Sequence, residues 1–203
     1  MAPLTAQPII KLALGADWER LHPSLRRQHD ITPGIPGEVA MQGVLYEVFH
    51  SRTAKLFVLP ARLFGALVHY RGHDIPTRVR TWTRADDPIN VYWHRSFHFP
   101  GRRPVVFASR MAYLGGREVI EYVRGGLGLR MRLTLHGQRL VYTCTGYQWH
   151  RSGLAVRVPD WALLGGGTIC QAGLAATEFQ MAFQLRHPWY GRTFAFSGDF
   201  RIM

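Results

Sequence analysis

Beyond residue 76 the chain alternates between apolar and polar positions, which is the pattern of strands with one buried face. Short connectors such as Gly115-Gly116 and His136-Gly137 separate several of these stretches and favour antiparallel hairpins. Residues 38–49 have a similar apolar pattern and are a further candidate strand. About eight paired strands would make a sheet curl strongly or close on itself. The candidate strands beyond residue 76 are residues 77–84, 90–99, 105–114, 118–123, 127–135, 139–149, 177–185 and 193–202.

The first 30 residues and residues 53–68 have the apolar spacing of helices instead. Pro60 must kink or restart the second of these helices. Residues 30–37, rich in proline and glycine, form a loop, and residues 165–167, three consecutive glycines, lie in a longer connection. We predict an α+β fold: a strongly curved or closed antiparallel sheet with N-terminal helices packed on it. A chain of 203 residues without a linker is predicted to be a single domain, residues 1–203.

Arg95 stands on the apolar face of its predicted strand. Alternation over residues 91–99 places Arg95 between Trp93 and Phe97 on the face that should be buried. A guanidinium among aromatic rings is costly unless it is paired. In the next but one strand, Glu121 shares a face with Val119 and Val123 in the same way. We therefore expect Arg95 and Glu121 to be partners, either as a structural ion pair or as the polar end of a ligand cavity.

Three further residues are candidates for the same site. Glu178 begins a predicted strand whose other face is apolar, so its carboxylate faces solvent or a cavity. Tyr147 and Trp149 share a strand face and are candidates to line a pocket, although packing in the core is the alternative. Arginines on other strand faces form either a solvated surface or an anion-binding wall, and we favour the first reading.

The charge of the chain is strongly basic, with 25 Lys plus Arg against 13 Asp plus Glu and a net charge of +12. Only Lys11 and Lys55 are lysines, and the arginines are spread along the chain without a dense run. A scattered basic surface supports nonspecific attraction to nucleic acid but not recognition. We therefore expect nucleic acid not to be the partner.

Motifs for metals, nucleotides and covalent catalysis are absent from the sequence. The two cysteines make neither a disulfide framework nor a zinc set, and the histidines lack metal-binding spacing. Glycine-rich segments are not followed by helical patterns that would hold a phosphate. We expect no metal and no cofactor. Without a membrane-length apolar run or a signal-peptide pattern, we expect a cytoplasmic protein with no membrane span.

Three stretches together resemble a known family. Residues 21–29 (LHPSLRRQH), the Trp93-x-Arg95-x-Phe97 strand, and residues 186–191 (RHPWYG) followed by 196–200 (FSGDF) occur in the order seen in the bacterial family of domains of unknown function numbered 4166. Members of that family also occur fused behind saccharopine-dehydrogenase-like domains. The resemblance implies recurrent glutamates at the positions of Glu121 and Glu178, but no established reaction. The chain departs from the family at residues 165–167, where a Leu-Pro-rich segment is expected.

Three functions are consistent with these observations. The leading hypothesis is a domain that binds a small apolar or aromatic ligand, with Arg95 contacting a carboxylate or carbonyl and Glu121 orienting Arg95. Trp93, Phe97, Tyr147 and Trp149 would line the cavity. The alternative is a cofactor-independent isomerase, cyclase or decarboxylase, with Glu121, or less favourably Glu178, as general base and Arg95 stabilising an oxyanion. The third is a structural or nucleic-acid-associated module in which the pair only stabilises the core.

Overall fold

A computed structural model describes residues 7–52, 54, 68–151 and 153–203. Three short helices begin this part of the chain: α1 (Ile9–Leu14), the 3-10 helix η1 (Gly15–Arg20) and α2 (Pro23–His29). Pro23 occupies the first turn of α2, where its missing N–H has no helical partner to lose, and the His22 side chain caps that turn. The helices expected in the first 30 residues are therefore present. The helix predicted at residues 53–68 lies outside the described residues except for Ala54 and Val68.

The described residues also form one eleven-stranded antiparallel sheet. Its order is β6-β5-β4-β3-β2-β1-β11-β10-β9-β7-β8, and β6 also pairs with β7. The strands are β1 (Gly37–His50), β2 (Gly72–Arg84), β3 (Asp87–Phe97), β4 (Val105–Gly115), β5 (Glu118–Val123), β6 (Leu127–His136), β7 (Arg139–Arg151), β8 (Leu154–Val158), β9 (Gly166–Ala175), β10 (Glu178–His187) and β11 (Gly191–Ile202).

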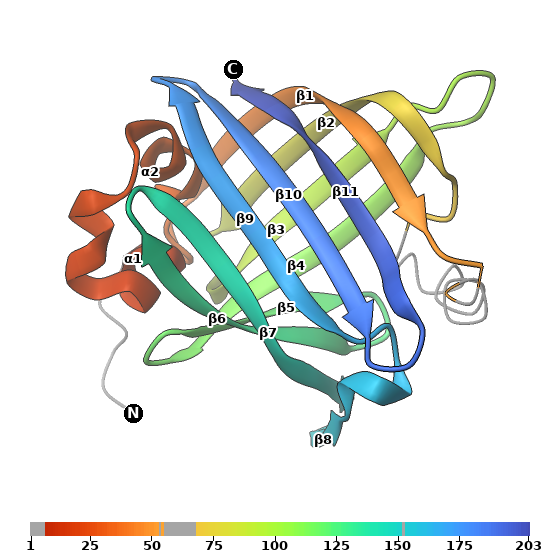
Figure 1. Cartoon of the computed structure of the whole chain (residues 1–203). Helices are drawn as coiled ribbons and strands as arrows, with labels where there is room; N and C mark the ends of the chain where they lie inside the picture. Colours follow the sequence, from red (N-terminus) through yellow and green to blue (C-terminus); the bar gives the residue numbers. More distant parts are fainter. Residues whose placement is uncertain (1–6, 53, 55–67, 152) are drawn as a thin grey trace.

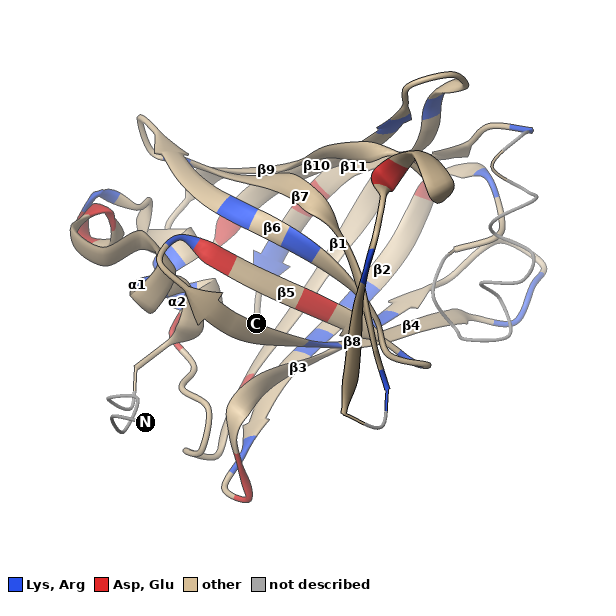
Figure 2. Ribbon diagram, turned by 90° about the horizontal axis from the view of Figure 1, so that it is seen from below, with Lys and Arg blue, Asp and Glu red and all other residues tan. Residues whose placement is uncertain are grey.

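Ten of these strands close into a barrel, because β7 pairs with β6 on one side and with β9 on the other. The prediction of a strongly curved or closed antiparallel sheet with N-terminal helices is confirmed. The described fold is mostly β with few helices where an α+β fold was predicted, and the barrel has ten strands where about eight were predicted. Closure removes the free sheet edges that would otherwise invite association. Strand β8 pairs only with the end of β7 and extends away from the barrel (Figures 1 and 2).

The alternation of apolar and polar positions did not predict strands β8 and β9. For β9 the reason is its glycines. Gly165 has φ +88°, and Gly166 and Gly167 begin the strand instead of lying in a connection. A Cβ at Gly167 would stand 1.9 Å from the carbonyl oxygen of Gln184 on β10. Glycine here allows close approach of two backbones, a role that resembles a loop signal when only the sequence is visible.

The helices cover one end of the barrel, and the loops that follow β1, β3, β5, β7 and β10 lie at the other end (Figure 1). Helix α1 contacts β4, β5 and β6, whereas α2 contacts β9 and β10. Trp18, Leu21 and Leu25 of the helical segment are buried in the same core cluster as Leu133 and Leu140 of the barrel. The helix-covered end is therefore filled with side chains, which confines open interior space to the middle and the opposite, loop-bearing end.

Candidate functional site

The buried ion pair expected from strand alternation is present inside the barrel. Arg95 Nη1 donates a hydrogen bond to Glu121 Oε1 over 2.8 Å, and the two side chains are only 15% and 11% exposed. Arg95 lies on β3 and Glu121 on β5, with β4 between them. The side chains therefore reach each other across the inner face of an intervening strand.

Strand β4 contributes two residues that complete the surroundings of Arg95. Ser109 Oγ accepts a hydrogen bond from Arg95 Nη1 over 2.9 Å and donates one to Glu121 Oε1. Phe107 pairs with Arg95 in register, and its ring centroid lies 5.2 Å from the guanidinium carbon. The ring of Trp93 lies 4.8 Å from the same carbon. Sequence analysis missed Phe107 and Ser109, although the alternation of residues 105–114 already put them on one face.

Much of the hydrogen-bonding capacity of the pair is not used by the protein. A guanidinium carries five N–H donors, and the contacts of Arg95 to Ser109 and Glu121 both involve Nη1. Within the described residues, no hydrogen bond reaches Nε or Nη2 of Arg95, or Oε2 of Glu121. Both side chains line interior cavities, so these atoms border open space. The pair thus offers several donors and one acceptor to a molecule inside the barrel.

On the side of the pair that faces the loop-bearing end lies a cavity of about 180 Å³. Among the described residues its lining is almost entirely aliphatic and aromatic, with Arg95 and Glu121 as the only charged groups. It includes the side chains of Phe97, Leu129, Tyr147, Leu164, Phe183 and Phe194. Apolar walls with a few convergent polar groups are the usual composition of a small-molecule site.

On the helix-covered side of the pair lies a smaller space of about 50 Å³, where the polar side chains of Gln28, His29, Tyr142 and Gln171 join a mostly apolar lining. His29 Nε2 lies 3.1 Å from Gln171 Oε1 and 3.2 Å from the Tyr142 hydroxyl, and Gln171 Nε2 donates to Gln28 Oε1. The indole N–H of Trp93, which also lines this space, is buried without a hydrogen-bond partner among the described residues. No pattern in the sequence pointed to His29 or Gln171, because one comes from a helix and the other from the unpredicted strand β9.

The polar groups on this side are uncharged at neutral pH. Burial lowers the pKa of His29 to about 4, and its hydrogen bond to Gln171 only partly opposes that shift. Burial, reinforced by the nearby Glu121 charge, raises the pKa of Tyr142 above its usual range. Desolvation penalises the charged form of each group. Arg95 and Glu121 are consequently the charges that a ligand in the interior would meet.

The other candidate residues are not all brought to this site. Phe97 and Tyr147 line the larger cavity, and the Tyr147 hydroxyl donates to the carbonyl of Gly165 over 2.9 Å. Trp93 lines the smaller space. Trp149 lines neither space and donates its indole N–H to the carbonyl of Gly125 over 3.0 Å. Alternation had put Trp149 on the face of Tyr147, but at this end β7 pairs with β6 and β8, and no longer with β9.

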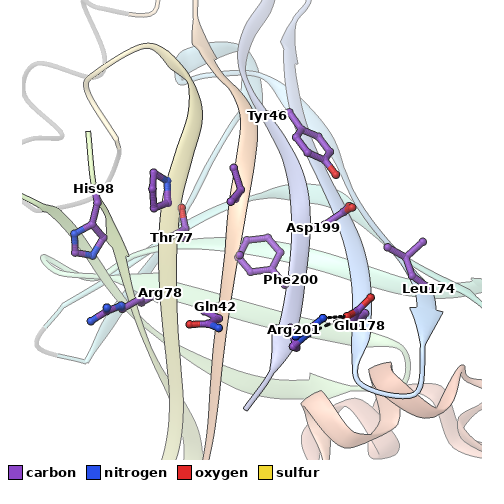
Figure 3. Close-up of a pocket in the computed structure, with 13 residues that line it drawn as sticks. Gln42, Tyr46, Thr77, Arg78, His98, Leu174, Glu178, Asp199, Phe200 and Arg201 are labelled. Atoms are coloured by element: carbon purple, nitrogen blue, oxygen red, sulfur yellow. Dashed lines mark hydrogen bonds and ion pairs between the residues drawn. The ribbon is translucent and has the colours of Figure 1, made fainter. Parts of the chain in front are cut away.

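Glu178 lies on the outside of the barrel, where it forms an ion pair with Arg201 (Figure 3). Both residues line an open groove of about 770 Å³ that runs over β1, β2, β10 and β11. Tyr46, Arg78 and Asp199 line the same groove. A hydrogen bond to Asp199 raises the pKa of Tyr46. The structure therefore separates Glu178 from Glu121 by the wall of the barrel. The groove is wide and exposed, so the enclosed interior cavity is the stronger candidate for a ligand site.

Two further features are absent from the described part of the chain. Its His, Cys, Asp and Glu side chains form no group of three or more with the geometry to hold a metal ion. Among the same residues, no helix has both the length and the apolar character needed to cross a membrane.

The chain was compared with curated proteins, solved structures and models of protein families. Neither the curated proteins nor the solved structures contain a match. The residues that carry the earlier resemblance, from Leu21 to Phe200, include the strand of Arg95 and both glutamates Glu121 and Glu178. The model of the family described as "Domain of unknown function (DUF4166)" matches residues 21–200, and the chain therefore belongs to this family.

Proposed function

We propose that the barrel interior binds a small apolar or aromatic molecule that carries a carbonyl or carboxylate group. The observation that supports this most directly is the set of unused donors on Arg95 at the edge of an apolar cavity. Buried donors are almost always satisfied in native proteins, by protein, water or ligand. A planar oxygen group on a ligand would satisfy Nε and Nη2 together, because the guanidinium fork suits such groups.

The cavity limits the size of this ligand. A cavity of about 180 Å³ is close to the roughly 150 Å³ that holds a benzene molecule in an engineered protein core. A single ring or a short branched chain therefore fits without rearrangement of the walls. Glu121 Oε2 receives no hydrogen bond from the described residues and can accept one from a ligand, which favours a ligand with a donor next to its carbonyl, as in an amide or a protonated acid.

Glu121 has a second role in this proposal, as the group that orients Arg95. Its carboxylate and the Ser109 hydroxyl both contact Nη1 of Arg95, and no hydrogen bond from the described residues occupies Nε or Nη2. The rings of Trp93 and Phe107 are cation–π partners of the same guanidinium. A charged group held in this way needs little reorganisation when a ligand arrives.

A cofactor-independent enzyme in the same cavity is the second candidate. Glu121 and Arg95 border one enclosed space, which would allow a carboxylate to remove a proton while the guanidinium stabilises the resulting oxyanion. Glu178 is withdrawn as the alternative base for this cavity because it lies outside the barrel. Replacement of Glu121 by Gln separates the two functions: binding alone should persist, whereas turnover should be lost.

Native mass spectrometry of freshly purified protein tests the binding proposal first. We expect an additional discrete mass that is released on denaturation and is absent from an Arg95→Met variant. Arg201→Met is the matched control, because it removes an arginine from a Glu–Arg pair on the outside of the barrel. Retention of the same mass by Arg95→Met would place the ligand elsewhere.

Calorimetric titration with benzamide and benzoate covers the case of a weakly held ligand. We expect at least one of these probes to bind the unmodified protein and the Arg201→Met control, with binding lost in Arg95→Met. If neither probe binds and no mass co-purifies, the structural role of the pair becomes the better explanation.

A further inference from the structure

An aromatic cluster lies exposed at the loop-bearing end of the barrel. Trp161 of the 3-10 helix η2 (Asp160–Ala162) and Trp189 in the β10–β11 turn have ring centroids 5.9 Å apart, and Tyr190 adjoins Trp189. All three are exposed, Trp189 to 69%. The buried His187 holds the cluster in place, because its ring stacks on Tyr190 and its Nε2 contacts the carbonyl oxygen of Trp161 over 2.6 Å. Packing against His187 thus holds these rings in place although they remain exposed to solvent.

Strand β8 extends the apolar part of this surface. Leu154 is 58% exposed and Val156 is also exposed, although both lie in a regular strand. Pro159 links β8 directly to η2, so the aliphatic side chains and Trp161 come from one short segment (Figure 1). Exposed apolar side chains gathered in one region usually mark an interaction site. The five residues Leu154, Val156, Trp161, Trp189 and Tyr190 are called the apolar rim below.

Exposed arginines accompany the apolar rim. Arg151 and Arg157 belong to the β7–β8 hairpin, Arg186 precedes His187, and Arg124 lies in the β5–β6 turn at the same end. No ion pair joins any of these four to an acid in the described part of the chain. Asp160 of η2, which precedes Trp161, also forms no ion pair among the described residues, so four unpaired arginines accompany one unpaired acid in this region.

The opposite, helix-covered end holds most of the acidic side chains (Figure 2). The ion pair of Asp17 with Arg117 joins η1 to the β4–β5 turn there. This distribution makes the loop-bearing end the positive end of the molecule. Acids at the helix-covered end include Asp17, Glu19, Asp86, Asp87, Glu118 and Glu178.

We propose that the loop-bearing end docks on an anionic phospholipid membrane. The arginines would contact headgroup phosphates, Trp161, Trp189 and Tyr190 would sit at headgroup level, and Leu154 and Val156 would enter the acyl boundary. Tryptophan and tyrosine are favoured at that depth because each has an apolar body and a polar edge. Basic residues near an anionic leaflet add attraction that a neutral bilayer does not offer.

Two other occupants fit the surface less well. Nucleic acid would satisfy the arginines and stack on the aromatic rings, but it offers nothing for the exposed aliphatic side chains of β8. A second copy of the chain would bring the unpaired arginines of both copies together. The membrane satisfies the positive charge and the aliphatic side chains at once.

Leu163 and Leu164, which follow η2 directly, line the interior cavity. Docking at this end would place the cavity next to the bilayer, where apolar molecules partition. The docking proposal does not depend on the interior site, since it rests on surface residues that do not line the cavity.

Vesicle flotation tests the proposal. Purified full-length protein is mixed with vesicles of phosphatidylcholine alone or with about one third phosphatidylserine. We expect flotation with the anionic vesicles, loss of it at high salt because screening weakens surface attraction, and a blue shift of tryptophan emission. A Trp161→Ser/Trp189→Ser variant is expected to bind at least about ten-fold more weakly. Arg151→Gln/Arg157→Gln is expected to bind roughly twenty-five-fold more weakly, at about five-fold per arginine.

Matched controls at the helix-covered end separate docking from general basicity. Ile89→Ser removes an apolar side chain exposed to 53% in the β2–β3 hairpin, and Arg139→Gln removes an exposed arginine from the start of β7. Both are expected to bind vesicles like the unmodified protein, with circular dichroism confirming that every variant is folded.

Three results would overturn the proposal. The first is an absence of flotation with anionic vesicles. The second is binding to a duplex or single-stranded oligonucleotide that is tighter than vesicle binding at the same salt and is lost in the rim variants. The third is a concentration-dependent dimer that the rim substitutions dissociate without any membrane binding.

Discussion

Two Glu–Arg pairs of this protein have the same chemistry and nearly the same contact distance, but opposite environments. Arg95 and Glu121 meet at 2.8 Å inside the barrel, whereas Arg201 and Glu178 meet at 2.5 Å on its outer surface. The inner side chains are 15% and 11% exposed and the outer ones 64% and 37%. Water screens the outer pair and competes for its hydrogen bonds, so its contribution to stability is small. The inner pair is costly to break and is the one that the proposed ligand would contact.

The largest expected effect is the loss of one partner from the inner pair. Glu121→Leu leaves the Arg95 charge buried without its counter-ion, which should lower the free energy of unfolding by about 3–5 kcal/mol. Urea unfolding at pH 7 measures the change, with Glu178→Leu as the matched control on the outer pair. Equal effects of the two substitutions would contradict the distinction between inner and outer pairs.

Acidification should also lower the free energy of unfolding, because it favours protonation of a histidine that is buried inside the barrel. The pKa of His29 falls from about 6.5 in the unfolded chain to about 4 in the folded protein. A lowered histidine pKa means that the unfolded chain binds the proton first as pH falls. The stability contribution is thus complete above about pH 6.5 and is lost progressively between about pH 6.5 and pH 4, by roughly 3 kcal/mol in total.

Urea unfolding across this pH range, compared between the unmodified protein and His29→Gln, isolates that contribution. Between about pH 6.5 and pH 4, we expect the free energy of unfolding to fall by roughly 3 kcal/mol more in the unmodified protein than in His29→Gln. His136→Gln, which removes an exposed histidine from the end of β6, is the matched control substitution. An identical slope in His29→Gln would show that His29 is not the titrating group.

Replacement of the whole inner pair should cost much less than replacement of one partner. Arg95→Met/Glu121→Leu removes both charges and keeps apolar volume, so we expect most of the stability lost in Glu121→Leu to return, to within about 1 kcal/mol of the unmodified protein. The same double variant should no longer bind benzamide or benzoate. Recovery of stability with unchanged binding would rule out Arg95 as the ligand anchor.

The smallest effect is expected at the outer pair. Glu178→Gln removes the charge but keeps the shape, and exposed pairs contribute about 0.5 kcal/mol or less. Urea midpoints at low and high salt should differ little between this variant and the unmodified protein, since salt already screens the pair. A loss above about 2 kcal/mol would mean that the outer groove is an organised site.

Sequence reasoning reached the inner pair but not the whole site. The faces of Arg95 and Glu121 followed from period-two alternation, which is a local property of each strand. The same alternation was present around Phe107 and Ser109 but was not used to assign them to the site. It misplaced Trp149, because the neighbour of β7 changes from β9 to β8 towards this end, and it treated Glu178 as a possible companion of Glu121. A strand pattern tells which residues share a face but not which face of a closed sheet is inside.

The sequence by itself determined the positions of most strands, the short N-terminal helices, and the presence of two charges on otherwise apolar strand faces. Each of these depends on neighbours within a few residues. Only the tertiary structure decided that ten strands close, that Gly166 and Gly167 belong to a strand against β10, and that His29 meets Gln171. Those contacts join residues far apart in the chain, and their geometry depends on register and closure, which no local periodicity encodes.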